Sequence, residues 1–174
     1  DTFDGTIMPQ PILSIGYCGH TAHGRKEYIN ALKNSNLRTD FILREGFWAP
    51  ELKDKAVAKN EFDRNIRRNL FTFCHRGAGN FSYRFYETLM HGRIPLLIDT
   101  DCDLPFHDYW KKNYIGPLTT SLDPMDLSGL ISKYYDKASP YLHNIQIENR
   151  ILWEHYFSPR GFINSLHKDL LSYV

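Results

Sequence analysis

The stretch 70–100, LFTFCHRGAGNFSYRFYETLMHGRIPLLIDT, contains two apolar runs with a glycine loop and an amphipathic segment between them. The runs LFTFCH (70–75) and IPLLIDT (94–100) are short and apolar, which predicts two buried strands. The segment SYRFYETLMH (82–91) places apolar side chains at helical spacing. A strand, a helix and a second strand in this order predict a β-α-β unit whose strands are parallel and covered on both faces.

The same alternation continues on both sides of this unit, and the helix of 82–91 is expected to end at Gly92. Further strands are expected at 12–19, 40–46 and 114–118, and helices at 23–34, within 47–69, and at 124–137, 141–155 and 161–173. We therefore predict an α/β fold with a Rossmann-like parallel sheet flanked by helices and a helical C-terminal tail. Residues 1–11 are interpreted as an entry arm, 12–140 as the Rossmann-like domain and 141–174 as the tail.

Composition restricts the class of partner. The 174 residues suffice for one domain with a core, and the net charge of +1 gives no global field for nucleic acid. The densest basic run, RNIRRN (64–69), is interpreted as a solvated helix face, so no nucleic-acid partner is expected. No apolar run approaches the roughly 18 residues of a membrane span. Three scattered cysteines, an odd number without a C-x-x-C pair, favour a reducing, cytoplasmic location.

The loop between the first strand and the helix of the quoted stretch is a predicted anion site. A glycine loop that leads into a helix N-terminus directs free N–H groups and the positive end of the helix dipole at one point. Gly77 and Gly79 are expected to let the backbone approach a ligand closely, and Asn80 or Ser82 to cap the helix. Arg76 precedes the loop, and its planar, permanently charged guanidinium suits a phosphate oxygen.

Two charged residues follow inside the helix. Arg84 lies in the first turn, where it is expected to join Arg76 at a diphosphate. Glu87 lies three residues later, on much the same helix face, where its carboxylate could accept hydrogen bonds from both ribose hydroxyls. The alternative for Glu87 is an ordinary surface ion pair with Arg84, worth about 0.3–0.5 kcal/mol.

Better-known phosphate loops fit this stretch less well. It lacks the Gly-Lys-Ser/Thr of a Walker loop. It nearly matches the dinucleotide fingerprint, with Ser82 at the last glycine position and Asp99 or Asp101 about 20 residues further on, where a ribose-binding acid falls. An NAD(P)-dependent oxidoreductase is therefore a weaker alternative, because its helix would need neither Arg84 nor Glu87.

The string FTFCHRGAGNFSYRFYETLMHGRIPLLIDTDCDLPF (71–106) resembles the exostosin-like glycosyltransferases, glycosyltransferase family 47. That family carries F-x-L-C-x-R-G-x-G-x-x-S-x-R-x-x-E-A-L-x-x-G-x-I-P-V-I followed by LPF. The matching residues are Arg76, Gly77, Gly79, Ser82, Arg84, Glu87, Leu89, Gly92, Ile94, Pro95 and Leu104-Pro105-Phe106. Upstream, SIGYCGHTAHGRKEYINALKN (14–34) looks like the family's strand, glycine-ended turn and arginine-bearing helix. The chain departs from the pattern at His75, Thr88 and Arg93, where Pro, Ala and Cys are common.

The resemblance implies a GT-B enzyme built from two Rossmann-like halves, of which this chain looks like the C-terminal, donor-binding half. It implies a sugar transferred from a nucleotide-diphosphate sugar, UDP-sugars favoured, to a glycan or glycoconjugate acceptor. It also implies inversion at the anomeric carbon and no required metal or other cofactor, because arginines neutralise the diphosphate. The catalytic base is open. His20 and Asp101 are carried as catalytic candidates because they follow predicted strands, with His23 and Asp103 beside them.

Two further alternatives stand beside this reading. A free-standing half could be a non-catalytic nucleotide- or carbohydrate-binding module, which would bind ligand without turnover. If the full-length protein carries an N-terminal anchor, the expected location changes from the cytoplasm to the Golgi lumen. The chain does not begin with Met, and we expect it to be a fragment that lacks the N-terminal GT-B half. The tail 141–174 is then expected to brace the two halves.

Overall fold

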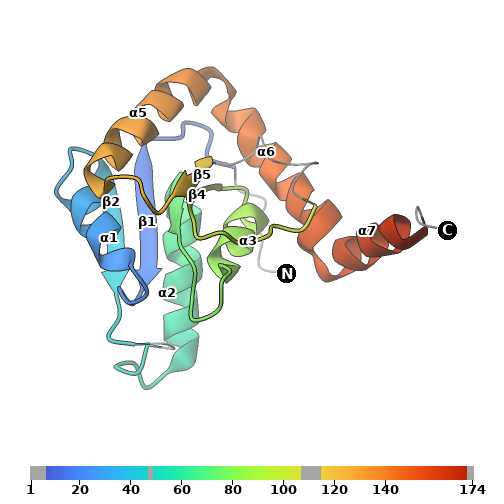
Figure 1. Ribbon diagram of the computed structural model, residues 1–174, viewed down its shortest axis with the longest axis horizontal. Coiled ribbons are helices and arrows are strands. Elements are labelled where there is room, and N and C mark those ends of the chain that lie inside the picture. The colour runs from blue at the N-terminus through green and yellow to red at the C-terminus, as the bar shows by residue number, and fades with distance from the viewer. Residues whose placement is uncertain (1–6, 47–48, 107–114, 172–174) are drawn as a thin grey trace.

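The computed structural model describes residues 7–46, 49–106 and 115–171. Within them five strands form one sheet, in the order β2-β1-β3-β4-β5, and every neighbouring pair is parallel (Figure 1). The strands are β1 (Ser14–Gly19), β2 (Arg38–Leu43), β3 (Phe71–Cys74), β4 (Ile94–Asp99) and β5 (Ile115–Thr119). The order reverses between β1 and β3, which is the topological switch point of a doubly wound sheet.

Helices cover both faces of this sheet, which confirms the predicted Rossmann-like α/β fold. They are α1 (Arg25–Lys33), α2 (Lys55–Arg68), α3 (Tyr83–Met90), α5 (Leu127–Ala138), α6 (Leu142–Leu152) and α7 (Pro159–Leu171), with short 3₁₀ turns η1 (Pro124–Asp126) and η2 (Ser139–Tyr141) and a π-helical segment η3 (Trp153–Phe157). In Figure 1, α6 and α7 follow α5 and lead away from the sheet toward the C-terminus of the chain.

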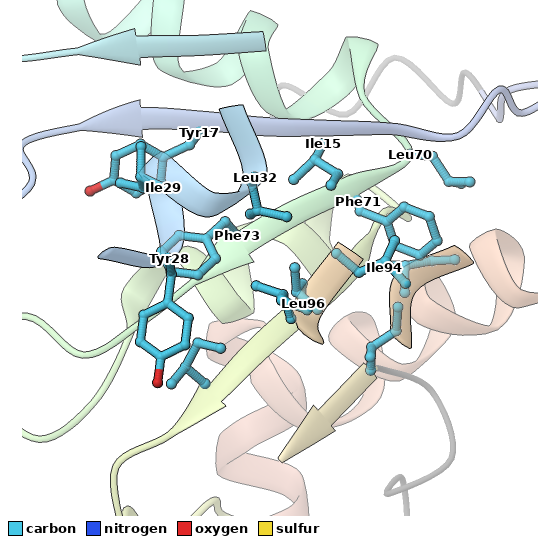
Figure 2. Close-up of a cluster of buried hydrophobic side chains, with 14 of the residues drawn as sticks. Ile15, Tyr17, Tyr28, Ile29, Leu32, Leu70, Phe71, Phe73, Ile94 and Leu96 are labelled. Atoms are coloured by element: carbon cyan, nitrogen blue, oxygen red, sulfur yellow. The ribbon is translucent and has the colours of Figure 1, made fainter. Parts of the chain in front are cut away.

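The main core lies between the sheet and the helices α1 and α5. Odd-numbered residues of β1, Ile15 and Tyr17, point to this face and contact the helix residues Ile29 and Leu32 (Figure 2). β3 and β4 add Phe71, Phe73 and other buried side chains to this cluster, and they bury Cys74 and Leu97 on the opposite face, so both strands are near-continuous apolar runs. A smaller cluster on the opposite face packs α3 against β3 and β4, through Phe85 among others.

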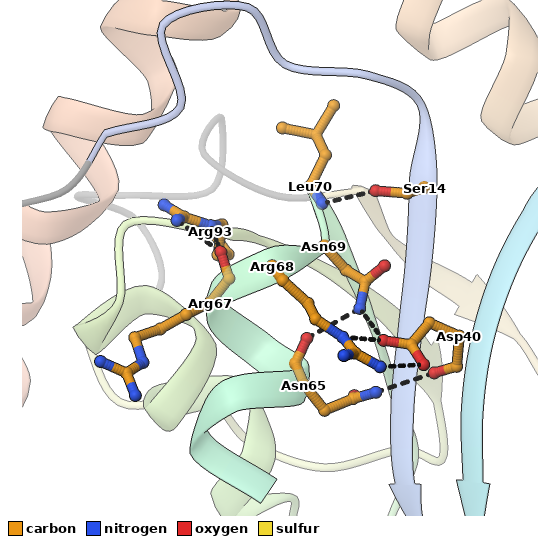
Figure 3. A network of polar contacts seen from close by, with 8 residues as sticks. All are labelled: Ser14, Asp40, Asn65, Arg67, Arg68, Asn69, Leu70 and Arg93. Atoms are coloured by element: carbon orange, nitrogen blue, oxygen red, sulfur yellow. Dashed lines mark hydrogen bonds and ion pairs between the residues drawn. The ribbon is translucent and has the colours of Figure 1, made fainter. Parts of the chain in front are cut away.

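Helix α2 packs on the other face of β1 and approaches its backbone closely. A Cβ at Gly16 would stand 2.8 Å from side-chain atoms of Asn65 and Asn69, so glycine at this position lets helix and strand meet. Asp40 of β2 accepts hydrogen bonds from Arg68 and Asn69 at 2.6–2.8 Å, and Asn65 donates to the Asp40 carbonyl (Figure 3). The interpretation of 64–69 as a solvated helix face holds for Arg64 and Arg68, which are exposed, but not for Asn65 and Asn69, which are buried in a polar contact with the sheet.

The C-terminal end of α3 has the predicted glycine stop. Gly92 adopts φ 64°, its N–H donates to the Leu89 carbonyl, and the Arg93 N–H donates to the Thr88 carbonyl. These two bonds form a Schellman motif, which satisfies carbonyls that a helix end leaves free. Arg93 is buried directly after this turn, and its guanidinium donates to the Arg67 carbonyl at the end of α2.

The tail and the entry arm contact each other. Gln146 of α6 exchanges two hydrogen bonds with the backbone of Met8, and Asn149 donates to the Arg93 carbonyl at 2.8 Å. Helix α6 therefore packs against the domain at the start of β4.

Several element boundaries differ from the sequence predictions. β2 ends at Leu43 rather than 46, and the helix expected over 141–155 becomes π-helical from Trp153 before α7 begins at Pro159. The helix expected from His23 begins at Arg25, because His23 and Gly24 both have positive φ, 63° and 80°. Arg25, the first residue of α1, lies on the buried face of this helix.

Candidate functional site

The predicted loop lies at the carboxyl edge of the sheet, at its switch point. β1 ends at Gly19 and continues into His20, and neighbouring β3 ends at Cys74 and continues through His75 into the loop that begins at Arg76. Open α/β sheets bind ligands in the crevice beyond these strand ends, because the chain leaves adjacent strands in opposite directions there. The fold thus brings the residues after β1 and β3 to one place.

Arg84 lies across the end of β1. Its Nη2 donates to the Cys18 carbonyl at 2.6 Å, and its guanidinium carbon lies 4.5 Å from the centroid of the Tyr17 ring and 5.4 Å from that of Phe62. Cation–π contact on two rings and one hydrogen bond hold the charge in place. The Nε of Arg84 is buried and has no hydrogen-bond partner among the described residues.

Glu87 lies one turn further along α3, half-buried on the side that faces α2. Burial raises the pKa of its carboxyl, while the positive charges of Lys59 and Arg84 lower it and Asp63 raises it. Within the described part of the chain, Arg84 and Glu87 form no ion pair, since Arg84 turns to the end of β1. The alternative of a simple surface pair between these two side chains was wrong.

The glycine loop is closed by a hydrogen bond from the Gly77 N–H to the Phe81 carbonyl at 3.0 Å. Neither Gly77 nor Gly79 has a positive φ, so the backbone here does not require the conformational freedom of glycine. A Cβ at Gly79 would meet the Phe81 ring at 2.7 Å, whereas at Gly77 it would meet only the Phe81 carbonyl, at 3.9 Å. Gly77 leaves open space, while Gly79 makes room for an aromatic ring of its own loop.

The sequence left open whether Asn80 or Ser82 is the N-cap residue of α3. Ser82 is the N-cap residue of α3, but its side chain makes no capping hydrogen bond. Asn80 binds the loop after β4 instead: its Nδ2 donates to the Asp101 carbonyl at 2.9 Å, and its Oδ1 accepts from Thr100. The expectation that Asn80 caps the helix was wrong. The Phe85 N–H of the first turn donates to the Ser82 carbonyl at 3.1 Å, and because no side chain caps α3, the N–H groups of Tyr83 and Arg84 are available to an anion.

The two catalytic candidates lie on different loops. His20 follows β1, its Nε2 lies 3.4 Å from Arg25 Nη1, and its pKa is lowered by burial and by the charges of Arg25, His23 and Arg84. Asp101 follows β4 and is exposed, with φ 62°, and it is tied to the glycine loop only through its carbonyl. The side chain that caps this turn is that of Asp99, which accepts from the Asp101 N–H at 2.8 Å.

Arg25 is the residue of this edge that the sequence analysis did not select. Only 5 % of its surface is exposed, and it donates to the carbonyls of His20 and Arg76, which lie on the two sides of the switch point. The pattern Arg25, Tyr28, Ile29, Leu32 has the i, i+3, i+4, i+7 spacing of a buried stripe, which was a usable signal. An arginine on the apolar stripe in the first turn predicts a buried charge.

Two hollows lie away from this edge. One, of about 610 Å³, is lined by η3 and α7, and another, of about 330 Å³, lies beside Met8, Arg38 and Arg68. The described residues contain no group of three or more His, Cys, Asp and Glu side chains arranged for a metal ion. None of the described helices has the length and apolar character needed to cross a membrane.

The fold and this edge define a class: an α/β protein with a doubly wound, Rossmann-like sheet whose switch point carries arginines. No protein-family model matches the sequence, and no curated protein is significantly similar to it.

Proposed function

We propose that this chain is the donor-binding half of an inverting glycosyltransferase that transfers a sugar from a nucleotide-diphosphate sugar, with UDP-sugars favoured, to a glycan or glycoconjugate acceptor. The observation that carries the proposal is the position of Arg84, whose guanidinium lies over the end of β1 at the switch point. A fixed cation at this place matches the phosphate end of a nucleotide, because planar guanidinium groups bind phosphate oxygens in pairs.

The neighbours of Arg84 fit the other parts of such a donor. Arg76 and the uncapped N-terminus of α3 add positive charge, so the leaving diphosphate would be stabilised without a metal ion. Glu87 lies one turn below Arg84 and presents a carboxylate suited to the two ribose hydroxyls. Phe81 and Tyr83 are exposed at the start of α3 with their rings 4.8 Å apart, which offers an aromatic surface to the base.

His20 is the better of the two candidates for the catalytic base. Burial and the adjacent Arg25 charge hold the pKa of His20 below its ordinary value, which favours the neutral imidazole that a general base requires. Asp101 lies on the loop after β4, which is two strands from β1, where the Arg84 guanidinium lies. In this proposal the acceptor hydroxyl approaches from the His20 side, a second α/β half completes the cleft, and α6 and α7 brace the two halves.

Calorimetry with nucleotides tests the proposal. UDP should bind the chain, and Arg84→Gln should weaken binding more than tenfold, since a charge-assisted hydrogen bond contributes about 1.5–3 kcal/mol. Arg160→Gln is the matched control, because Arg160 is exposed at the start of α7, away from the switch point, and its loss should leave UDP affinity unchanged. Equal UDP affinity in the native chain and a folded Arg84→Gln variant would remove Arg84 from the site and the proposal with it.

A further inference from the structure

A second helix begins at the same crevice as α3. Helix α1 follows β1, and its N-cap, Gly24, has φ 80° and no side chain to cap the first turn. The ring of His75, which follows β3, lies 3.7 Å from where a Cβ of Gly24 would stand. By contrast, α2 follows β2 at the same edge, and the side chain of Asp54 caps it by accepting from the Ala56 N–H. Of the helices α1, α2 and α3, the two without a side-chain cap are therefore α1 and α3, which flank the switch point.

Arg25 lies in the first turn of α1 and is 95 % buried, by its exposed fraction of 5 %. Its Nη1 donates to the His20 carbonyl at 3.2 Å and its Nη2 to the Arg76 carbonyl, while its Nε has no partner among the described residues. Both acceptors are neutral carbonyls, and the acidic residue of the turn, Glu27, is exposed. A buried guanidinium that has only neutral partners lacks the counter-ion that would normally offset the cost of its burial.

The charges around Arg25 increase this imbalance. Burial lowers its pKa, and so do the nearby positive charges of Arg84 and Arg76, with only the Tyr17 hydroxyl acting in the opposite sense. The pKa values of His20 and His75 are likewise lowered by burial and by neighbouring arginines. Arg25, Arg76 and Arg84 thus lie close enough to act on one another at the same edge of the sheet. A bound anion would offset their mutual repulsion.

We propose that Arg25 and the N-terminus of α1 form a second anion subsite, which takes one phosphate of a diphosphate whose other phosphate lies at Arg84 and the N-terminus of α3. This inference rests on the proposed donor site and extends it across the switch point. The hydrogen bond from Arg25 to the Arg76 carbonyl ties the two subsites together at a fixed spacing. The crevice therefore selects two linked phosphate groups over one, which makes it a site for nucleoside diphosphates rather than monophosphates.

Calorimetric titration of UDP, UMP and inorganic pyrophosphate into the native chain and Arg25→Gln tests the second subsite. The native chain should bind UDP at least tenfold more tightly than UMP. Arg25→Gln should abolish this preference: the affinity for UDP should fall, while the affinity for UMP should stay within about twofold. The expected size is that of one lost charge-assisted contact. Arg84→Gln should weaken both nucleotides. Loss of UDP and UMP affinity in equal proportion in Arg25→Gln, or a preference for UDP that survives the change, would overturn the inference.

A measurement on the native chain keeps the test valid if Arg25→Gln does not fold. The Nε–H resonance of Arg25 should shift in ¹H–¹⁵N spectra on saturation with UDP or pyrophosphate, and much less with UMP. No shift with either diphosphate ligand would overturn the second subsite. Binding of UDP and UMP with equal affinity would leave nucleotide binding intact but remove the subsite. Binding of pyrophosphate without any nucleotide would retain the subsite and refute the donor-binding proposal.

Discussion

The guanidinium of Arg84 stacks on the ring of Tyr17, with 4.5 Å between its central carbon and the ring centroid. The hydroxyl of the same tyrosine donates to the His20 carbonyl. Tyr17 is fully buried in β1, so one rigid ring supports both the cation proposed to bind phosphate and the loop of the proposed base. Preorganised charge of this kind is effective because the protein does not have to reorient it when the ligand arrives.

Gly19→Ala should displace the Arg84 side chain without unfolding the domain. A Cβ at Gly19 would stand 2.8 Å from Arg84 Nη2 and 3.2 Å from the Tyr17 hydroxyl, and the closer contact requires the guanidinium to move. We expect nucleotide affinity to fall about tenfold or more, as for loss of a charge-assisted contact, while the domain stays folded with a lowered unfolding midpoint, because φ at Gly19 is 158°. Calorimetry and thermal unfolding on the same sample check this. Unchanged UDP affinity in Gly19→Ala would show that the guanidinium position is irrelevant to binding.

The contact of Asp40 with Arg68 and Asn69 should contribute stability at neutral pH. Hydrogen bonds from Arg68 and Asn69 hold the pKa of the Asp40 carboxyl below its ordinary value of 3.8. A depressed acid pKa adds stability that is present above the unfolded pKa and lost as pH falls through the folded pKa. Because Arg68 is half exposed, Asp40→Asn should cost only about 1 kcal/mol in the free energy of unfolding at pH 7. Urea unfolding should show this difference shrinking below pH 4, and a difference that persists at pH 2 would contradict the account.

His91 should make the fold sensitive to mild acid. Its side chain is buried at the end of α3, and burial lowers its pKa from 6.5 to about 4, against the raising effect of Asp63. A histidine whose pKa is lowered in the folded state stabilises the fold above its unfolded pKa, and this contribution is lost as pH falls toward 4. Between pH 7 and pH 5 the loss should be about 2 kcal/mol. The slope of unfolding free energy against pH should flatten in this interval in His91→Gln, and an unchanged slope would mean that another group is responsible.

Two glycine-to-alanine substitutions should have opposite effects on stability. At Gly92 a Cβ would clash with the Gln146 carbonyl at 2.8 Å, and its φ of 64° is one that L side chains rarely adopt, so Gly92→Ala should destabilise by more than about 1 kcal/mol. Gly129 lies in α5 with nothing within 4 Å of an added Cβ, so Gly129→Ala should stabilise by about 0.5–1 kcal/mol. Thermal unfolding of both variants checks this pair, and a gain from Gly92→Ala would show that the Schellman turn is dispensable.

The fold of residues 70–100 was predicted correctly from the sequence because the hydrophobic pattern and the glycine stop indicate the same structure there. Two apolar runs, an amphipathic helix and the Gly92 stop all indicate one β-α-β unit, and β3, α3 and β4 follow within a few residues of the predicted bounds. The proposed donor site is built largely from this unit, so Arg76, Arg84 and Glu87 could be selected without knowledge of the tertiary structure. The contact of the polar end of α2 with the sheet could not be predicted from the sequence, because the Asp40 that pairs with Arg68 lies 28 positions away.

The sequence by itself determined the alternation of strands and helices and the loop with its arginines, because hydrophobic period and glycine stops act over a few residues. Only the tertiary structure decided that β1 and β3 are neighbours, and with that pairing the position of Arg25 between His20 and Arg76. Strand order is set by non-local packing, so a buried arginine 51 residues from its carbonyl partner is visible only after the sheet has formed.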